Sequence, residues 1–87
     1  MQKKTYTITA ETGVHARPAT LLVNKASQYE SEVELQYKDK TVNLKSIMGV
    51  MSLGIPQGAE ITIVTNGSDA ENAIQGIDEI IKEHLGE

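Results

Sequence analysis

The chain has 87 residues, a formal net charge of -4 and no cysteine. This length predicts one small domain over residues 1–87, with a core but without a large enclosed active-site cavity. The absence of cysteine excludes disulfides and thiol chemistry, and two histidines far apart in sequence argue against a metal site. We expect no cofactor.

Charge and hydropathy narrow the possible partners. No apolar run approaches the roughly 20 residues needed to cross a bilayer, so we expect no membrane insertion and a cytoplasmic location. A negative net charge, with no Phe or Trp and three Tyr, argues against direct nucleic-acid binding. Residues 1–56 carry seven basic and five acidic groups, whereas residues 57–87 carry one basic and seven acidic groups. An acidic partner is therefore expected on the first part of the chain.

The first two predicted elements are a strand and a helix. Residues 3–10 alternate between apolar and polar side chains, which predicts a strand with one buried face. Gly13 supplies the turn that follows. Residues 16–27 carry apolar side chains at helical spacing, namely Ala19, Leu22, Val23 and Ala26. This spacing predicts an amphipathic helix on the sheet.

His15 stands at the corner between these two elements, where we expect it to be the N-cap of the helix. Pro18 in the first turn favours helix initiation at this point. The backbone N–H groups of Ala16 and Arg17 would then remain free for an anion, and the Arg17 guanidinium suits phosphate oxygens. Neutral imidazole is a good nucleophile near pH 7. The stretch thus combines a nucleophile, a cation and free amides, although a lone histidine here can also be only a modest cap.

A hairpin is predicted next. Residues 32–37 and 40–44 alternate, and Lys38-Asp39 forms the polar turn between them. The glutamates of the first strand are expected on a solvated face rather than in a metal site, because carboxylates two residues apart on one strand lack further ligands.

The segment from Ser46 to Gly54 predicts a helix of about two turns, with Ser46 as N-cap and Gly54 as C-cap. Its interior is apolar nearly all round, which exceeds what a short helix buries on one side. We assign Val50 and Leu53 to the core and three residues to an exposed patch: Ile47, Met48 and Met51. Methionine is adaptable, so the patch suits several partners. The alternative is that all five residues belong to the core.

The last two elements are a strand over residues 60–65 and a long helix. Ser68 with Glu71 forms a capping-box pattern that predicts the helix start at Ser68. The apolar stripe of this helix consists of Ala70, Ala73, Ile74, Ile77, Ile80, Ile81 and Leu85. His84 near the C-terminal end is expected to be a favourable dipole partner without a role in the site.

The element order is therefore β-α-β-β-α-β-α, which predicts an α+β fold. The economical arrangement is a four-stranded sheet with one polar face and three helices on the other.

Two sequence motifs, which we call words below, resemble those of a known family. They are Gly-Val-His-Ala-Arg-Pro-Ala around His15 and Leu-Lys-Ser-Ile-Met-Gly-Val-Met-Ser-Leu-Gly around Ser46. With these words, and nearly end to end, the chain resembles HPr, the histidine-containing phosphocarrier family of the bacterial phosphoenolpyruvate-dependent sugar phosphotransferase system. The second word is similar to the form found in low-GC Gram-positive bacteria. The resemblance implies an open-faced β-sandwich with an antiparallel sheet.

The resemblance also implies partners and residue roles. Enzyme I would pass a phosphoryl group to Nδ1 of His15, which would pass it to the IIA domains of sugar permeases, with Arg17 helping to hold it. Ser46 matches the serine that HPr kinase/phosphorylase phosphorylates in this family. The serine-phosphorylated form would then be a corepressor for the catabolite control regulator. The residues implied in partner binding are Thr20, Ile47, Met48 and Met51. A monomer fits such a shuttle.

Two other classes of function stay open from sequence. A non-catalytic interaction or corepressor module would use the helix around Met48 and need His15 only as a cap. A small regulatory subunit would bind a phosphorylated metabolite reversibly at the helix start. In the resembled family a purely regulatory paralogue lacks the active histidine, which this chain retains. The pairs Asn24-Lys25 and Lys38-Asp39 depart from typical members, which concerns partner preference more than chemistry.

Overall fold

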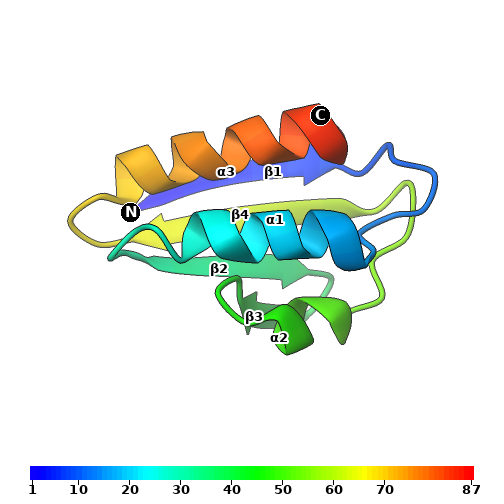
Figure 1. Ribbon diagram of the computed structural model, residues 1–87, viewed down its shortest axis with the longest axis horizontal. Helices are drawn as coiled ribbons and strands as arrows, with labels where there is room; N and C mark the ends of the chain where they lie inside the picture. The colour runs from blue at the N-terminus through cyan, green and yellow to red at the C-terminus, as the bar shows by residue number, and fades with distance from the viewer.

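The computed structural model describes all 87 residues (Figure 1). Four strands and three helices follow one another in the predicted order. Their bounds are β1 Gln2–Thr7, α1 Ala16–Ala26, β2 Glu32–Tyr37, β3 Lys40–Asn43, α2 Ile47–Met51, β4 Glu60–Asn66 and α3 Ala70–His84. The predicted α+β class and element order are thus confirmed.

The four strands form one antiparallel sheet in the order β1-β4-β2-β3. The strand β4, last in sequence, lies in the centre between β1 and β2 (Figure 1). Its residue Ile61 is opposite Tyr6 of β1 on one side and Tyr37 of β2 on the other. Apolar side chains of three strands therefore align in rows on one face of the sheet.

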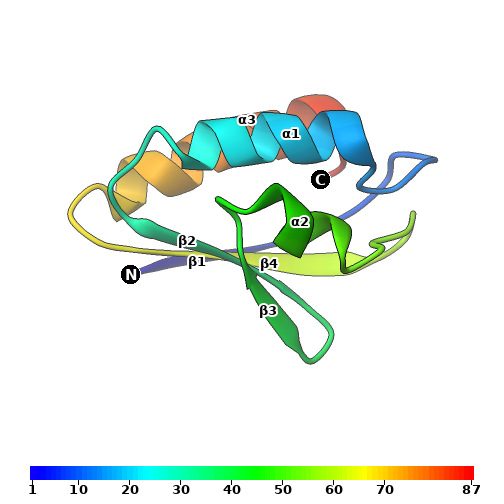
Figure 2. The same cartoon turned by 60° about the horizontal axis from the view of Figure 1, so that its bottom comes forward.

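All three helices cover that apolar face and leave the other face open (Figure 2). Eighteen buried residues form one core cluster between the two layers, and the central strands contribute side chains such as Leu35 and Ile63, both fully buried. The open face carries polar residues, and the hydroxyls of Thr5 and Thr62 lie 3.0 Å apart on it. This alternation is typical of an antiparallel sheet with one solvated face.

The helices α1 and α3 pack side by side and run in opposite directions (Figures 1 and 2). The predicted stripe of α3 faces the core, since five of its residues are buried within the helix and Ile80 packs against the cluster. On α1, Leu22 and Ala26 are fully buried as predicted. The antiparallel arrangement brings the beginning of α1 and the end of α3 to the same end of the molecule.

The first strand is shorter than the predicted 3–10. It ends at Thr7 because the chain then changes partner: Ile8 forms a bridge with Gly86, and Thr9 and Ala10 donate to the Leu85 carbonyl at 2.9 and 3.0 Å. The segment after α3 is thereby fixed against the segment that leads to His15.

The predicted start of the last helix at Ser68 is wrong. The N-cap is Asp69, and the helix begins at Ala70. The Asp69 carboxylate does not cap the helix but accepts the backbone N–H groups of Glu30 and Ser31, at 3.0 and 2.9 Å, and the Ser31 hydroxyl. This side chain therefore joins the start of α3 to the start of β2.

The second helix is also shorter than predicted. It ends at Met51 with Ser52 as C-cap, and Gly54 follows in a left-handed conformation with φ of 58°. Val50 is buried as predicted, whereas Leu53 is only half-buried against the core. None of the three helices is long and apolar enough to traverse a lipid bilayer.

Candidate functional site

The position of His15 is fixed by the residues just before it. Gly13 adopts φ of 65°, and a Cβ at this position would overlap the Ile55 carbonyl and the Pro56 backbone. The buried Val14 donates its N–H to the same Ile55 carbonyl at 2.9 Å. Only glycine combines this conformation with so close an approach of two backbone segments. The corner before α1 is thus anchored to the segment between α2 and β4.

The helix α1 begins as predicted, with His15 as its N-cap. The His15 backbone is extended and its carbonyl accepts the N–H of Ala19 at 3.0 Å, but its imidazole makes no capping hydrogen bond and is exposed. The N–H groups of Ala16 and Arg17 donate to no protein acceptor. The helix start therefore presents an unengaged imidazole next to two unengaged N–H donors, an arrangement suited to an anion.

The other predicted residues of α1 lie on the same end of the helix. Arg17 is exposed, and the next residue, Pro18, is buried in the first turn. Thr20 is exposed, one turn further along, and its hydroxyl donates to the Ala16 carbonyl at 2.8 Å. A partner that approaches His15 thus meets Arg17 and Thr20 on the same exposed surface.

A small hollow of about 160 Å³ lies at this end of the molecule. Its lining residues are His15, Arg17, Pro18, Leu21 and His84. The volume is well below the roughly 300 Å³ at which sites for organic ligands begin. Every side chain around it that can carry charge is basic. The small size and the basic rim of this hollow suit a small anionic group.

The position of His84 near the C-terminal end of α3 predicts only a favourable dipole partner, and it does not predict that His84 lines this hollow. No local signal could reveal it, because 69 positions separate the two histidines. They come together only through the antiparallel packing of α1 and α3.

The segment around Ser46 forms a separate surface on α2. Ser46 is the N-cap as predicted, and its Oγ accepts the N–H of Gly49 at 3.1 Å. The three residues of the predicted patch are exposed: Ile47 by 39%, Met48 by 81% and Met51 by 40%. The interpretation that the whole segment belongs to the core is therefore wrong, because only Val50 is fully buried on this helix.

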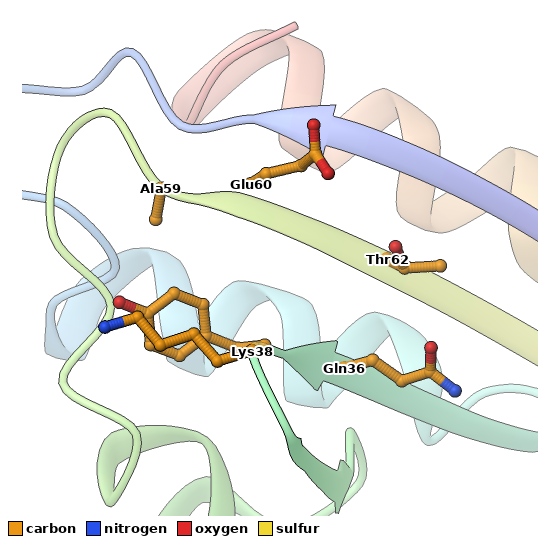
Figure 3. A pocket seen from close by; sticks show the side chains of 6 residues that line it. Gln36, Lys38, Ala59, Glu60 and Thr62 are labelled. Atoms are coloured by element: carbon orange, nitrogen blue, oxygen red, sulfur yellow. The ribbon is translucent and has the colours of Figure 1, made fainter.

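The largest hollow lies elsewhere and offers no comparable chemistry (Figure 3). It measures about 400 Å³ and is lined by β2, β4 and the turn after β2. Lys38 extends over the Tyr37 ring, 5.3 Å from its centroid, and Glu60 and Thr62 border the other side. None of the predicted site residues lines it. No group of three or more His, Cys, Asp or Glu side chains is placed to hold a metal ion.

The sequence matches the model of a known protein family. The family model described as "PTS HPr component phosphorylation site" matches residues 2–83. The chain belongs to the HPr phosphocarrier family. As a member of this family it is a phosphoryl carrier of the phosphotransferase system and not an enzyme in its own right.

Solved structures of HPr proteins superpose closely. The histidine-containing phosphocarrier protein of Mycoplasma is 43% identical, with a TM-score of 0.93 and coverage of 94% of this chain and 93% of that one. HPr from Bacillus anthracis is 42% identical, with a TM-score of 0.84 and coverage of 91% and 94%. Crh, the catabolite repression protein of Bacillus subtilis, is 38% identical, with a TM-score of 0.75 and coverage of 90% of each chain. The resemblance to Gram-positive HPr is thus confirmed.

Proposed function

We propose that this protein accepts a phosphoryl group from enzyme I on Nδ1 of His15 and donates it to the IIA domains of sugar permeases. The observation that carries the proposal is the exposed His15 imidazole, which makes no capping bond, beside the free N–H groups of Ala16 and Arg17. We further propose that the protein acts as a single-domain monomer in the cytoplasm, because a shuttle must meet its partners in turn.

The chemistry requires little more than this corner. The lone pair of Nδ1 attacks phosphorus, a P–N bond forms, and the bond from phosphorus to the donor atom breaks, with its electron pair remaining on the donor. Nε2 keeps its proton. The negative oxygens then face the N–H groups of Ala16 and Arg17 and the Arg17 guanidinium. An exposed site holds the group loosely enough for the next acceptor to take it in the reverse sequence of bond changes.

Mass spectrometry after incubation with phosphoenolpyruvate and catalytic enzyme I tests this proposal. We expect one acid-labile adduct, located on His15 by fragmentation and absent from a folded His15→Ala variant. A pure interaction module would carry no adduct. A metabolite-binding subunit would bind a phosphate ester reversibly and would likewise carry no covalent group.

We also propose that Ser46 is the regulatory site for HPr kinase/phosphorylase and that its phosphorylated form binds the catabolite control regulator. Support comes from the exposed position of Ser46 at the start of α2, beside the patch of Ile47, Met48 and Met51. A phosphate there would add up to two negative charges at the edge of an apolar docking surface. The phosphate would repel acidic partners, and removing its bound water on docking would cost free energy.

The charge effect can be tested with Ser46→Asp. We expect phosphoryl transfer from enzyme I to slow by about tenfold, while the NMR signals of the His15 ring keep their wild-type positions. Ser27→Asp is the matched control, because Ser27 is an exposed serine at the far end of α1. Equal transfer rates for Ser46→Asp and Ser27→Asp would contradict the proposed regulation.

A further inference from the structure

His84 shares the small hollow with His15 and Arg17, although it belongs to the last turn of α3. The apolar side of the hollow is formed by Pro18 and Leu21. No carboxylate lines it, so its chargeable rim consists of two imidazoles and one guanidinium. Three basic groups from two helices around a space of about 160 Å³ are typical of a site for a small anion.

The backbone holds His84 in this place. The residue that follows it, Leu85, is 1% exposed, and its carbonyl accepts the N–H groups of Thr9 and Ala10. Gly86 then lies against the Thr7 carbonyl without room for a side chain. The chain around His84 is thus fixed to the same loop that leads into His15, so the backbones of the two histidines keep their relative positions.

The contact of His84 with Glu83 contributes too little to stability to explain the position of His84. Its Nε2 lies 3.5 Å from a carboxylate oxygen of Glu83, and both side chains are largely exposed, at 43% and 71%. An exposed pair of this kind contributes little to the free energy of unfolding. The imidazole is therefore free to serve a second, anionic partner in the hollow.

We propose that His84 is a third binding residue for the phosphoryl group carried by His15. In its protonated form the imidazole donates an N–H to a phosphoryl oxygen, in addition to the contact made by Arg17. The inference rests on the proposed phosphorylation of His15. It predicts that the phosphoryl group is held more strongly at lower pH, because a protonated imidazole is a cationic donor and a neutral imidazole is not.

The charged or titratable groups placed next to His84 are Arg17 and His15 at the start of α1 and Glu83 on its own helix. Thr9 and Ala10, which hydrogen-bond to the neighbouring Leu85 carbonyl, are uncharged. A comparison of wild type with variants at position 84 keeps the other three groups constant. The difference between them therefore isolates the contribution of the His84 charge.

The test measures the equilibrium of phosphoryl transfer between enzyme I and the protein from pH 6 to pH 8.5. At pH 6 we expect His84→Gln to reduce the phosphorylated fraction, with an equilibrium constant lower by on the order of threefold. At pH 8.5 wild type and His84→Gln should coincide. His84→Lys, with a cation that persists at this pH, should exceed both there.

Lys82→Gln is the matched control, since it removes a cation from the same turn that does not line the hollow. Its equilibrium should match wild type at every pH. The inference is overturned if His15 is phosphorylated but wild type and His84→Gln agree throughout, or if Lys82→Gln changes the equilibrium as much as His84→Gln does. Failure of every variant and of wild type to form an adduct on His15 would instead overturn the proposed function itself, and this inference with it.

Discussion

A single buried tyrosine joins the first strand to the last helix. Tyr6 is 2% exposed, and its hydroxyl donates to Oδ1 of Asp78 at 2.7 Å. Burial and this neighbouring carboxylate raise the pKa of Tyr6 far above its ordinary value. Burial pushes the pKa of Asp78 upward, but the Tyr6 hydroxyl and the ammonium groups of Lys4 and Lys82, at 3.1 and 3.3 Å, outweigh it and hold the pKa below the usual range.

Replacement of this hydroxyl should change both stability and its dependence on pH. We expect Tyr6→Phe to lower the free energy of unfolding at pH 7 by about 1–2 kcal/mol, because Asp78 loses a hydrogen bond. In wild type the raised pKa of Tyr6 favours the protonated phenol in the folded state. The contribution of this shift to the free energy of unfolding is complete below about pH 10, and it is lost as pH rises toward the pKa of Tyr6 in the folded state.

Urea denaturation at pH 7 and pH 11 measures both effects. The variant should lose less stability than wild type between these two values. Tyr37→Phe is the control, because the Tyr37 hydroxyl makes no hydrogen bond, and it should show the wild-type alkaline loss. An unchanged alkaline loss in Tyr6→Phe would contradict the assignment.

At the scale of elements, features that depend on local spacing could be predicted from the sequence, whereas features that depend on distant contacts could not. The stripes of α1 and α3 and the alternation of β2 could be predicted because each depends on spacing within one segment. The cap of α3 could not, because Asp69 is engaged by Glu30 and Ser31, about 38 positions away. The Ser31 hydroxyl and then the Glu30 N–H hold the pKa of Asp69 below its ordinary value.

The same division applies to the site. The cap at His15, the free amides beside it and the patch on α2 follow from short words in the sequence. The sheet order and the entry of His84 into the hollow depend on how α1 and α3 pack, and no residue near position 84 indicates it. Sequence pattern thus predicts which face of an element is buried better than it predicts which elements meet.

If α2 carries the proposed docking surface, its exposed side chains contribute to binding and not to folding, and this can be tested at Met48. The side chain is 81% exposed, so Met48→Asp should change the free energy of unfolding by less than about 0.5 kcal/mol. We expect it to weaken association with enzyme I by about tenfold, because a charge in the centre of a docking patch must be desolvated. Isothermal titration calorimetry measures the binding.

Thr41→Asp serves as the control for added charge, since Thr41 is an exposed residue on β3 and not on α2. It should bind enzyme I as wild type does. Equal weakening by both substitutions would mean that net charge, and not the patch on α2, determines association.

At the scale of the whole molecule, one core of eighteen residues supports the entire fold. Leu35 is fully buried on β2, opposite Ile63 of β4 and Val42 of β3. We expect Leu35→Ala to lower the free energy of unfolding by about 2–5 kcal/mol. In a small domain with a total of roughly 5–15 kcal/mol this is a large share.

Thermal and urea unfolding followed by circular dichroism measure the loss. Met48→Ala is the matched comparison, because it truncates an apolar side chain that is exposed, and it should stay within about 0.5 kcal/mol of wild type. Similar losses for the two variants would contradict the division between core and patch.

The central position of β4 has a consequence for synthesis. Until residues 60–66 have left the ribosome, β1 has no strand beside it, and β2 has only β3. The nascent chain can close its hairpin but not its sheet, and α1 has no completed surface to cover. The sheet therefore cannot close until β4 has emerged, long after β1, α1 and β2 have left the ribosome.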